Sequence, residues 1–253
     1  MGIKRRQEIL RRVQQAGYVS ARDLAEEYGV DTSTLRRDLD ALARLGLVIR
    51  NHGGASLPAE QSPAAAGDGT GQAPHRRAIG RAVAALIGDD RSVGLDGAPM
   101  TLEVARALRS VPGTTVVTNS LRVATELAAQ GDVRLVVLGG EVLADRSTLV
   151  GDRATDLARD LQLDYAVVGA DAVGPRGIAI ADSFEAPVKR ALIAAAATVV
   201  VVADSSAFGR SALVRLAGLD QVGLVVTDDG LPADVAATCG VEVVRVPVTD
   251  ESA

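Results

Sequence analysis

The stretch DLAEEYGVDTSTLRRDLDALARLGLVIRNHGGA, residues 23–55, decides the fold of the N-terminal part of the chain. Within it, Leu35, Leu39 and Leu42 are spaced as i, i+4 and i+7, so they share one face of a helix. Asp31 precedes this pattern and is a typical N-cap residue. The spacing therefore predicts an amphipathic helix that buries its leucines and exposes its arginines.

Two more helices and a pair of strands are expected around this helix. An apolar helical pattern ends near Gly17, and Ser20 lies three residues before Asp23, as in a capping box. Gly46 is a typical helix-ending residue, and residues 47–57, LVIRNHGGASL, predict two short strands joined by a Gly-rich turn. Helix, helix, turn, helix and hairpin are the outline of a winged helix-turn-helix.

The third predicted helix is the one that would enter the major groove of DNA. Arg36 and Arg37 can each grip a guanine with two hydrogen bonds, whereas Arg5 and Arg6 are expected near phosphates. The alternative is a solvated helix face on which Arg36 or Arg37 pairs with Asp40. The residues expected to contact double-stranded operator DNA are Thr32, Ser33, Thr34, Arg36, Arg37, Arg50, His52 and Gly53.

The net charge of −5 is an average over two unlike parts of the 253-residue chain. Up to Leu57, ten Lys and Arg stand against seven Asp and Glu, a charge of +3; the remainder has 17 against 25, a charge of −8. A basic N-terminal part followed by an acidic remainder suggests that the two parts have different functions. Aromatic residues make up only 2% of the chain, so DNA binding is expected to depend on a few placed arginines and not on base stacking.

The composition also limits the expected cofactors and location. A single cysteine, Cys239, excludes an internal disulfide framework, and with two histidines the chain has too few soft ligands for a metal site. We therefore expect no metal and no cofactor. Apolar runs are too short for a transmembrane helix, and residues 1–12 lack the apolar stretch of a secretion signal. The sequence thus predicts a cytoplasmic protein with no membrane partner.

A change of composition marks the expected domain boundary. Residues 58–75, PAEQSPAAAGDGTGQAPH, contain almost nothing large and apolar, which predicts a flexible linker. This linker would separate a winged helix-turn-helix domain at residues 1–57 from a second domain at residues 76–253.

The second domain alternates short Val, Ile and Leu runs with Ala-rich helical stretches. This pattern predicts an α/β fold with a mainly parallel sheet covered by helices on both faces. The expected strands are SVGLD, TVVTN, VRLVVLGG, DYAVVGAD, TVVVVADS, VGLVVTD and VEVVRV. Because ligands of open α/β sheets bind beyond the carboxyl ends of the strands, we expect a pocket at the residues that follow them. These are Asp96, Thr118 with Asn119, Gly139 with Gly140, Asp171 and Asp204.

Residues 23–55 resemble the N-terminal signature of the DeoR (deoxyribose-operon repressor) family of bacterial transcription regulators. The likeness rests on the TLRRDL core at residues 34–39 and on the HGGA turn at residues 52–55. It implies sequence-specific operator binding, with Arg36 and Arg37 in the recognition helix and the HGGA turn in the wing.

The likeness continues in the body, where TVVTNSL, VLGGE, DYAVVGADAV, EAPVKRALI and VVADSSAFGR follow in the family's order. It implies a sensor fold related to ribose-phosphate isomerase and the CoA transferases, and an effector that is usually a phosphorylated sugar or a sugar-derived metabolite. The residues expected to bind the effector are Asp96, Gly97, Ala98, Thr101, Asn119, Ser120, Gly139, Gly140, Asp171, Glu185, Lys189, Asp204, Ser205 and Arg210.

Two departures from the family pattern concern phosphate binding. The family's loop after the first strand runs Asp-Ser/Gly-Gly-Thr-Thr-Thr, whereas residues 98–100 here are Ala-Pro-Met and Pro99 has no N–H. The family's Asp-Ser-Ser-Lys-Phe-Gly has Ala207 in place of its lysine. Lys189 and Arg210 are the cations left to compensate. These changes predict weaker phosphate binding or a ligand of another class, less polar or uncharged.

Together these patterns predict a DNA-binding transcription regulator, a repressor of a metabolic operon that a small effector releases. Helix-turn-helix proteins bind two-fold operators as dimers, so a homodimer or a higher homo-oligomer is expected. One alternative is a sugar-phosphate isomerase with Asp96, Asp171 or Glu185 as its base, although Ala207 removes an electrophilic partner and the head would serve no purpose. The other alternative is a regulator without effector control.

Overall fold

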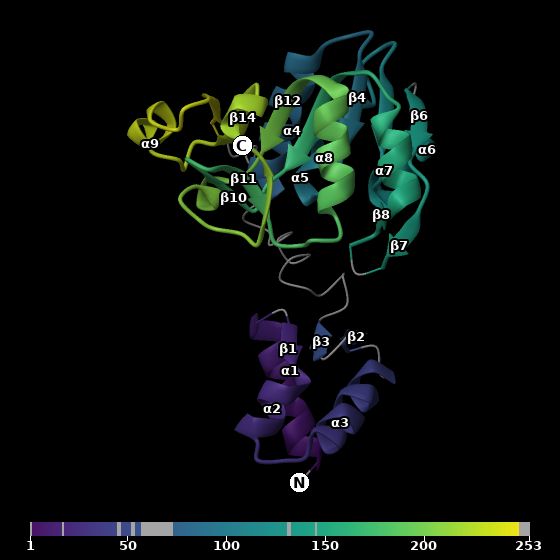
Figure 1. The fold of residues 1–253 in the computed structure, drawn as a ribbon, viewed down its shortest axis with the longest axis vertical. Helices are drawn as coiled ribbons and strands as arrows, with labels where there is room; N and C mark the ends of the chain where they lie inside the picture. The colour runs from purple at the N-terminus through teal and green to yellow at the C-terminus, as the bar shows by residue number, and fades with distance from the viewer. Residues whose placement is uncertain are drawn as a thin grey trace, which may run out of the picture. The chain divides into compact units, whose positions relative to one another are not determined.

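The computed structural model describes residues 2–16, 18–44, 47–51, 54–56, 73–130, 133–144 and 146–247. The chain divides into two compact units, Met1–Gln72 and Ala73–Ala253, here called the head and the body (Figure 1). Each unit is described by itself. No helix among the described residues is long and apolar enough to span a bilayer.

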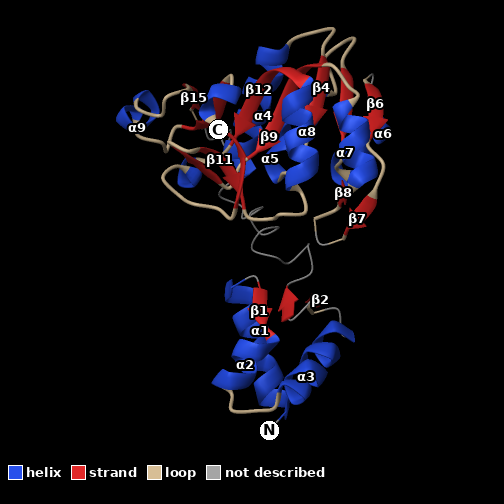
Figure 2. Cartoon of the chain, in the orientation of Figure 1, coloured by secondary structure: helices blue, strands red, loops and turns tan. Residues whose placement is uncertain are grey.

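The described residues of the head form helices and a small antiparallel sheet (Figure 2). Its elements are α1 (Gly2–Ala16), β1 (Tyr18–Ser20), α2 (Ala21–Glu27), α3 (Thr32–Arg44), β2 (Ile49–Asn51) and β3 (Gly54–Ser56), with the strands in the order β1-β3-β2. The three helices and the β2–β3 pair confirm the predicted winged helix-turn-helix. Strand β1 was not predicted, because three residues are too few to show an alternating pattern.

Capping and apolar spacing explain where the head helices begin and how they pack. The Ser20 hydroxyl accepts from the N–H of Asp23 at 3.4 Å, and the Asp31 carboxylate accepts from the N–H of Ser33 at 2.7 Å. The predicted leucine face of α3 is buried, and each such side chain contributes about 1.5–3 kcal/mol. The core of the head consists of Ile9, Val13, Val19, Ala21, Leu24, Ala25, Leu35, Leu39, Leu42, Val48 and Ala55.

A seven-stranded sheet forms the centre of the body, in the order β15-β14-β12-β9-β4-β5-β6. Every neighbouring pair in it is parallel, which confirms the predicted sheet. Each strand comes from one of the seven apolar runs. The strands are β4 (Ser92–Leu95), β5 (Thr115–Thr118), β6 (Arg134–Val137), β9 (Leu163–Gly169), β12 (Ala196–Val202), β14 (Leu224–Asp228) and β15 (Glu242–Val246).

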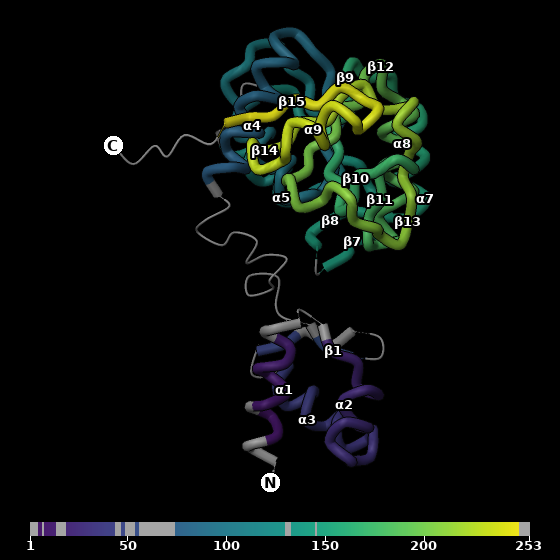
Figure 3. Tube along the Cα trace, turned by 90° about the vertical axis from the view of Figure 1, so that its left-hand side faces the viewer, coloured from purple at the N-terminus to yellow at the C-terminus, as the bar shows by residue number. Residues whose placement is uncertain are grey.

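Helices cover both faces of this sheet (Figure 3). Val167 of β9 packs in the cluster formed with α4, α5 and α6, whereas its neighbours Ala166 and Val168 pack on the opposite side, where α7 and α8 lie. The helices are α4 (Ala73–Ile87), α5 (Pro99–Leu108), α6 (Leu121–Gln130), α7 (Asp152–Arg159) and α8 (Ala186–Ala195). Helix α4 begins three residues before the predicted domain start, because Pro74 fits the first turn of a helix.

Short antiparallel strands, none of them predicted, add to the body. A small sheet contains β10 (Ala172–Gly174), β11 (Gly177–Ile180) and β13 (Val214–Ala217), and β7 (Glu141–Leu143) pairs with β8 (Thr148–Val150). Strands of three or four residues carry too little periodicity to be recognised in a sequence. A short helix, α9 (Ala233–Ala237), precedes β15.

Candidate functional site

Helix α3 presents a polar face to solvent. Ser33, Arg36 and Arg37 are exposed, whereas Thr32 and Thr34 at the helix start are half-buried. Within the described part of the chain, neither Arg36 nor Arg37 forms an ion pair, which leaves both guanidinium groups available to DNA. Of the expected wing contacts, Arg50 lies in β2 without a described side chain, and His52 and Gly53 lie outside the described residues.

Asp38 joins the expected recognition helix to α1. Its carboxylate accepts from Arg5 at 2.6 Å and from Arg6 at 2.8 Å, and its side chain is only 5% exposed. Burial alone would raise the pKa of Asp38, but the hydrogen bonds from the two arginines outweigh burial and lower it. We expected Arg5 and Arg6 near phosphates. In the structure, both form ion pairs with Asp38.

Five positions predicted for the effector site follow five adjacent strands of the body sheet. In sheet order, Asp204 follows β12, Asp171 follows β9, Asp96 follows β4, Asn119 follows β5, and Gly139 lies two residues after β6. Because the strands are parallel, all five positions lie at the same edge of the sheet.

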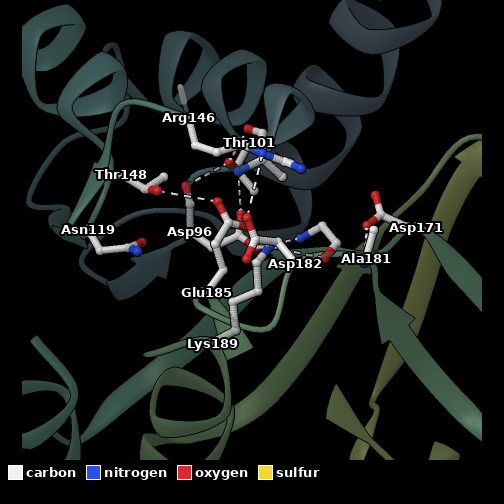
Figure 4. A network of polar contacts seen from close by, with 12 residues as sticks. Asp96, Thr101, Asn119, Arg146, Thr148, Asp171, Ala181, Asp182, Glu185 and Lys189 are labelled. Carbon is white, nitrogen blue, oxygen red and sulfur yellow. Dashed lines mark hydrogen bonds and ion pairs between the residues drawn. The ribbon is translucent and has the colours of Figure 1, made fainter. Parts of the chain in front are cut away.

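Two of these positions, Asp96 and Asn119, lie in a buried polar cluster with residues from other elements (Figure 4). Its members are Asp96, Asn119, Thr148, Glu185 and Lys189, each at most 6% exposed. The Lys189 ammonium donates to the Asp96 carboxylate and, at 3.3 Å, to the carbonyl of Gly169. Thr148 donates to Glu185 at 3.3 Å, and Glu185 Oε2 lies 3.9 Å from Lys189 Nζ.

Lys189 is the central charge of the cluster. Burial lowers the pKa of Lys189, but the charges of Asp96 and Glu185 and the hydrogen bond to Asp96 outweigh burial and raise it. Burial raises the pKa of Glu185, against the opposing effect of Lys189 and Arg146. Lys189 therefore stays protonated at neutral pH with its charge compensated inside the protein. Among the described residues, no group of three His, Cys, Asp or Glu side chains could hold a metal ion.

The loop between β4 and α5 uses its own hydrogen-bond donors. Asp96 Oδ1 accepts from the N–H of Ala98 at 2.9 Å. The Thr101 hydroxyl donates to the backbone oxygens of Asp96 and Ala98, at 2.9 and 2.6 Å. Pro99, the first residue of α5, supplies no N–H. The N–H of Ala98 and the hydroxyl of Thr101, both expected to bind a ligand here, thus stabilise the loop itself.

The start of α6 is tied to strand β8. Ser120 caps the helix by accepting from the N–H of Val123 at 3.3 Å. The Asn119 amide nitrogen donates to the carbonyl of Leu149 at 3.0 Å. The Asn119 Oδ1 atom is buried and has no hydrogen-bond partner among the residues that the structure describes.

Two glycines of the predicted site make close approaches to the chain itself. A Cβ on Gly97 would lie 1.9 Å from Thr148 Cγ2, and a Cβ on Gly140 would lie 2.4 Å from the carbonyl oxygen of Val150. Gly140 also has a φ of +134°, which L-residues rarely adopt. We expected Gly139 and Gly140 to allow the approach of a ligand; at Gly140 the close neighbour is strand β8.

Of the other predicted residues, Asp204, Ser205 and Arg210 have no described contact with the buried polar cluster. Asp204 accepts from the N–H of Ser206 at 2.9 Å, and the N–H of Ser205 donates to Asp228 at 2.7 Å. Arg210 is exposed and lines a groove of about 860 Å³ beside β11 and β13. Asp171 is exposed and accepts from the N–H of Ala181 at 2.7 Å.

Ala207, where the family has lysine, is buried among apolar residues next to β10. Its methyl group therefore belongs to the core of the body.

Sequence reasoning missed two residues of this edge. Thr148 lies in β8, a strand that gives no sequence signal, so only the structure places it beside Glu185. Asp228 ends β14, and it accepts from the N–H groups of Ser205 and Gly230 at 2.7 and 3.0 Å. The rule that polar residues follow strand ends would have found Asp228.

Comparison with known proteins identifies the family. The model of the DeoR-like helix-turn-helix domain matches residues 5–61, and the model of the DeoR C terminal sensor domain matches residues 72–229. The chain belongs to the DeoR family. The glycerol-3-phosphate regulon repressor of Escherichia coli (strain K12) is 33% identical over 234 residues, which cover 92% of this chain and 93% of the relative. The transcriptional repressor CsqR of the same strain is 31% identical over 234 residues, 92% and 90% of the two chains.

Solved structures similar to this DeoR-family chain share little sequence with it. Ribose 5-phosphate isomerase A from Neisseria gonorrhoeae aligns with a TM-score of 0.40 at 15% identity, over 53% of this chain and 52% of the isomerase. The eIF2B beta subunit from Chaetomium thermophilum aligns with a TM-score of 0.44 at 14% identity, over 77% and 54% of the two chains. The chain thus spans about half the length of these structures.

The ion pairs of Asp38 with Arg5 and Arg6 predict that the stability of the head depends on pH. Because the folded-state pKa of Asp38 is lowered, its contribution to stability is present above the usual Asp value of about 3.9 and is lost as the pH falls below it. Urea unfolding of the full chain, followed by circular dichroism, should show a smaller loss between pH 5 and pH 3 in Asp38→Asn than in the wild type. An equal loss of unfolding free energy in both proteins would contradict a stabilising role for these ion pairs.

The contact between Gly97 and Thr148 predicts a compensating pair of substitutions. Gly97→Ala should lower the free energy of unfolding by about 1–3 kcal/mol, because the new methyl group overlaps Thr148 Cγ2. Thr148→Ser removes that methyl group and keeps the hydroxyl, so it should restore part of the loss in the double variant. Thermal unfolding gives the stability of the two single variants and of the double variant. If the stability losses of the single variants simply add in the double variant, the contact is disproved.

Proposed function

We propose that this DeoR-family protein is a repressor of a metabolic operon and that a small molecule bound at the carboxyl edge of the body sheet releases it from the operator. The relatives named above are repressors, which supports this sign of regulation. The observation that most directly supports DNA binding is the exposed polar face of α3, whose two arginines form no ion pair with another described residue.

In this proposal, the residues of α3 read the sequence and the wing positions the head. Arg36 and Arg37 contact guanine edges, and Ser33 at the exposed start of the helix contacts a base or a phosphate. Arg50, His52 and Gly53 are assigned to the wing and the phosphate backbone. The helix start, with Thr32 and Thr34 half-buried, contributes polar contacts at the groove.

The effector acts by binding two conformational states of the protein with different affinities. A shift of 5–150-fold in operator affinity corresponds to a coupling free energy of about 1–3 kcal/mol. Two heads are needed for a two-fold operator, so we propose a homodimer or a higher homo-oligomer in which the ligand changes how the heads match the half-sites.

We propose no enzymatic activity for the body. Proton abstraction beside a carbonyl needs an accessible base and a cation free to stabilise the developing oxyanion. Asp96 is fully buried and already accepts from Ala98 and Gly169, and the charge of Lys189 is compensated by two carboxylates. These contacts favour a sensor over an isomerase.

Operator binding tests the assignment of α3. Arg36→Ala/Arg37→Ala should weaken binding to a selected operator fragment by about 2–6 kcal/mol, because each arginine lost removes about 1–3 kcal/mol of base recognition. Fluorescence anisotropy at several salt concentrations measures the loss.

A matched control is available on α1. Arg11→Ala/Arg12→Ala removes the same charge from the head, where these arginines pair with Glu8 and Glu27. The control variant should keep its preference for the operator over unrelated DNA. If the α3 variant keeps that preference too, α3 is not the recognition helix.

A further inference from the structure

Two arginines of α1 share one carboxylate of α3. The Nε–H of Arg6 donates to Asp38 Oδ1 at 2.8 Å, and the Nε–H of Arg5 donates to Asp38 Oδ2 at 2.6 Å, with Arg5 Nη2 at the same distance from that oxygen. A guanidinium group also carries N–H donors on both Nη atoms, so a bond through Nε leaves these for a second acceptor. The side chain of Arg6 is 42% exposed and that of Arg5 is 21% exposed. Arg6 is therefore the more accessible of the two to a ligand from solvent.

These three residues lie beside the exposed face of α3. Successive residues of a helix are turned by about 100°, so Asp38 lies between the exposed Arg37 and the buried Leu39. Its carboxylate is at the border between the polar face and the leucine face, on the side where α1 packs against α3 (Figure 2). When a helix lies in the major groove, the side chains at such a border face the phosphates that line the groove.

The group formed by Arg5, Arg6 and Asp38 has more cations than carboxylates. Two guanidinium groups and one carboxylate give it a charge of +1. Farther along α1, Arg11 pairs with Glu8, one carboxylate for one cation. An exposed guanidinium with excess positive charge complements a phosphate, which it can bind through two parallel hydrogen bonds.

We propose that Asp38 is a positioning residue for DNA binding, which holds Arg6 so that its Nη groups bind a phosphate of the DNA backbone beside the recognition helix. This inference rests on the proposed function, in that α3 enters the major groove. Because the carboxylate orients the guanidinium before DNA arrives, less side-chain entropy is lost on binding. The contact adds affinity for DNA of any sequence and takes no part in the choice of operator.

The salt dependence of DNA binding by the full chain tests the phosphate contact. Each phosphate contact that is lost lowers the slope of log K against log salt concentration by about 0.9. Arg6→Gln should lower the slope by about 0.9 for each bound head, and should weaken binding to an operator fragment and to unrelated DNA alike. Fluorescence anisotropy measures both.

Arg11→Gln is the matched control, because it removes the same charge from the same helix. Its slope should stay that of the wild type. An unchanged slope in Arg6→Gln overturns the phosphate contact, and so does an equal fall of the slope in Arg11→Gln.

Asp38→Asn separates positioning from charge. Removing a negative charge near DNA would by itself tighten binding. Positioning predicts the opposite, namely weaker binding to both DNAs and a slope that falls toward that of Arg6→Gln, with the preference for the operator kept. Binding as tight as in the wild type, or tighter, overturns the role of Asp38. A lost operator preference with an unchanged slope also overturns it, because a merely structural tie between α1 and α3 has that effect.

Circular dichroism shows whether Asp38→Asn folds. If it does not, Asp38→Glu takes its place, since this variant keeps the charge and moves the carboxylate by one methylene. The same fall of the slope is expected, and an unchanged slope overturns the positioning role. The operator preference of the wild type is measured in the same titrations, so failure of the proposed function shows there, while the slope on unrelated DNA still tests the phosphate contact.

Discussion

The ion pair between Lys189 and Asp96 is the interaction on which the carboxyl edge of the body depends. It joins α8 to the end of β4, and Asp96 also accepts from Gly169 at the end of β9. Both side chains are at most 3% exposed, so neither charge is stable there without the other. Breaking such a pair by removing one partner costs about 3–5 kcal/mol, because an uncompensated charge stays buried.

This pair also ties backbone groups of two neighbouring strand ends to one carboxylate. The N–H groups of Ala98 and Gly169 donate to Asp96, and Lys189 is held by Asp96 and Glu185. In the head, a second buried carboxylate acts in a similar way, because Asp38 holds Arg5 and Arg6 and fixes α3 against α1. Each unit thus uses a buried carboxylate to hold its elements in place.

The sequence predicted the parts of the fold that rest on long, repeated patterns. The leucine spacing of α3, the caps at Ser20 and Asp31 and the seven apolar runs each determine one element, and all are present. Strands β7, β8, β10, β11 and β13 were missed, because three or four residues carry no readable period.

The site was predictable only in outline. Parallel strands place Asp96 and Asn119 at one edge, whereas the partner of each side chain depends on tertiary packing that a sequence does not show. Lys189 was expected to be available to an anion and is instead enclosed.

The most direct test is the stability of Lys189→Met beside that of Arg190→Met, its exposed neighbour on the same helix. Hydrogen exchange and urea unfolding of the full chain measure both variants. Lys189→Met should lose about 3–5 kcal/mol and the protection of the Ala98 and Gly169 amides, while Arg190→Met should lose less than about 1 kcal/mol. Equal stability and unchanged protection in the two variants would contradict the central place of the Lys189–Asp96 pair.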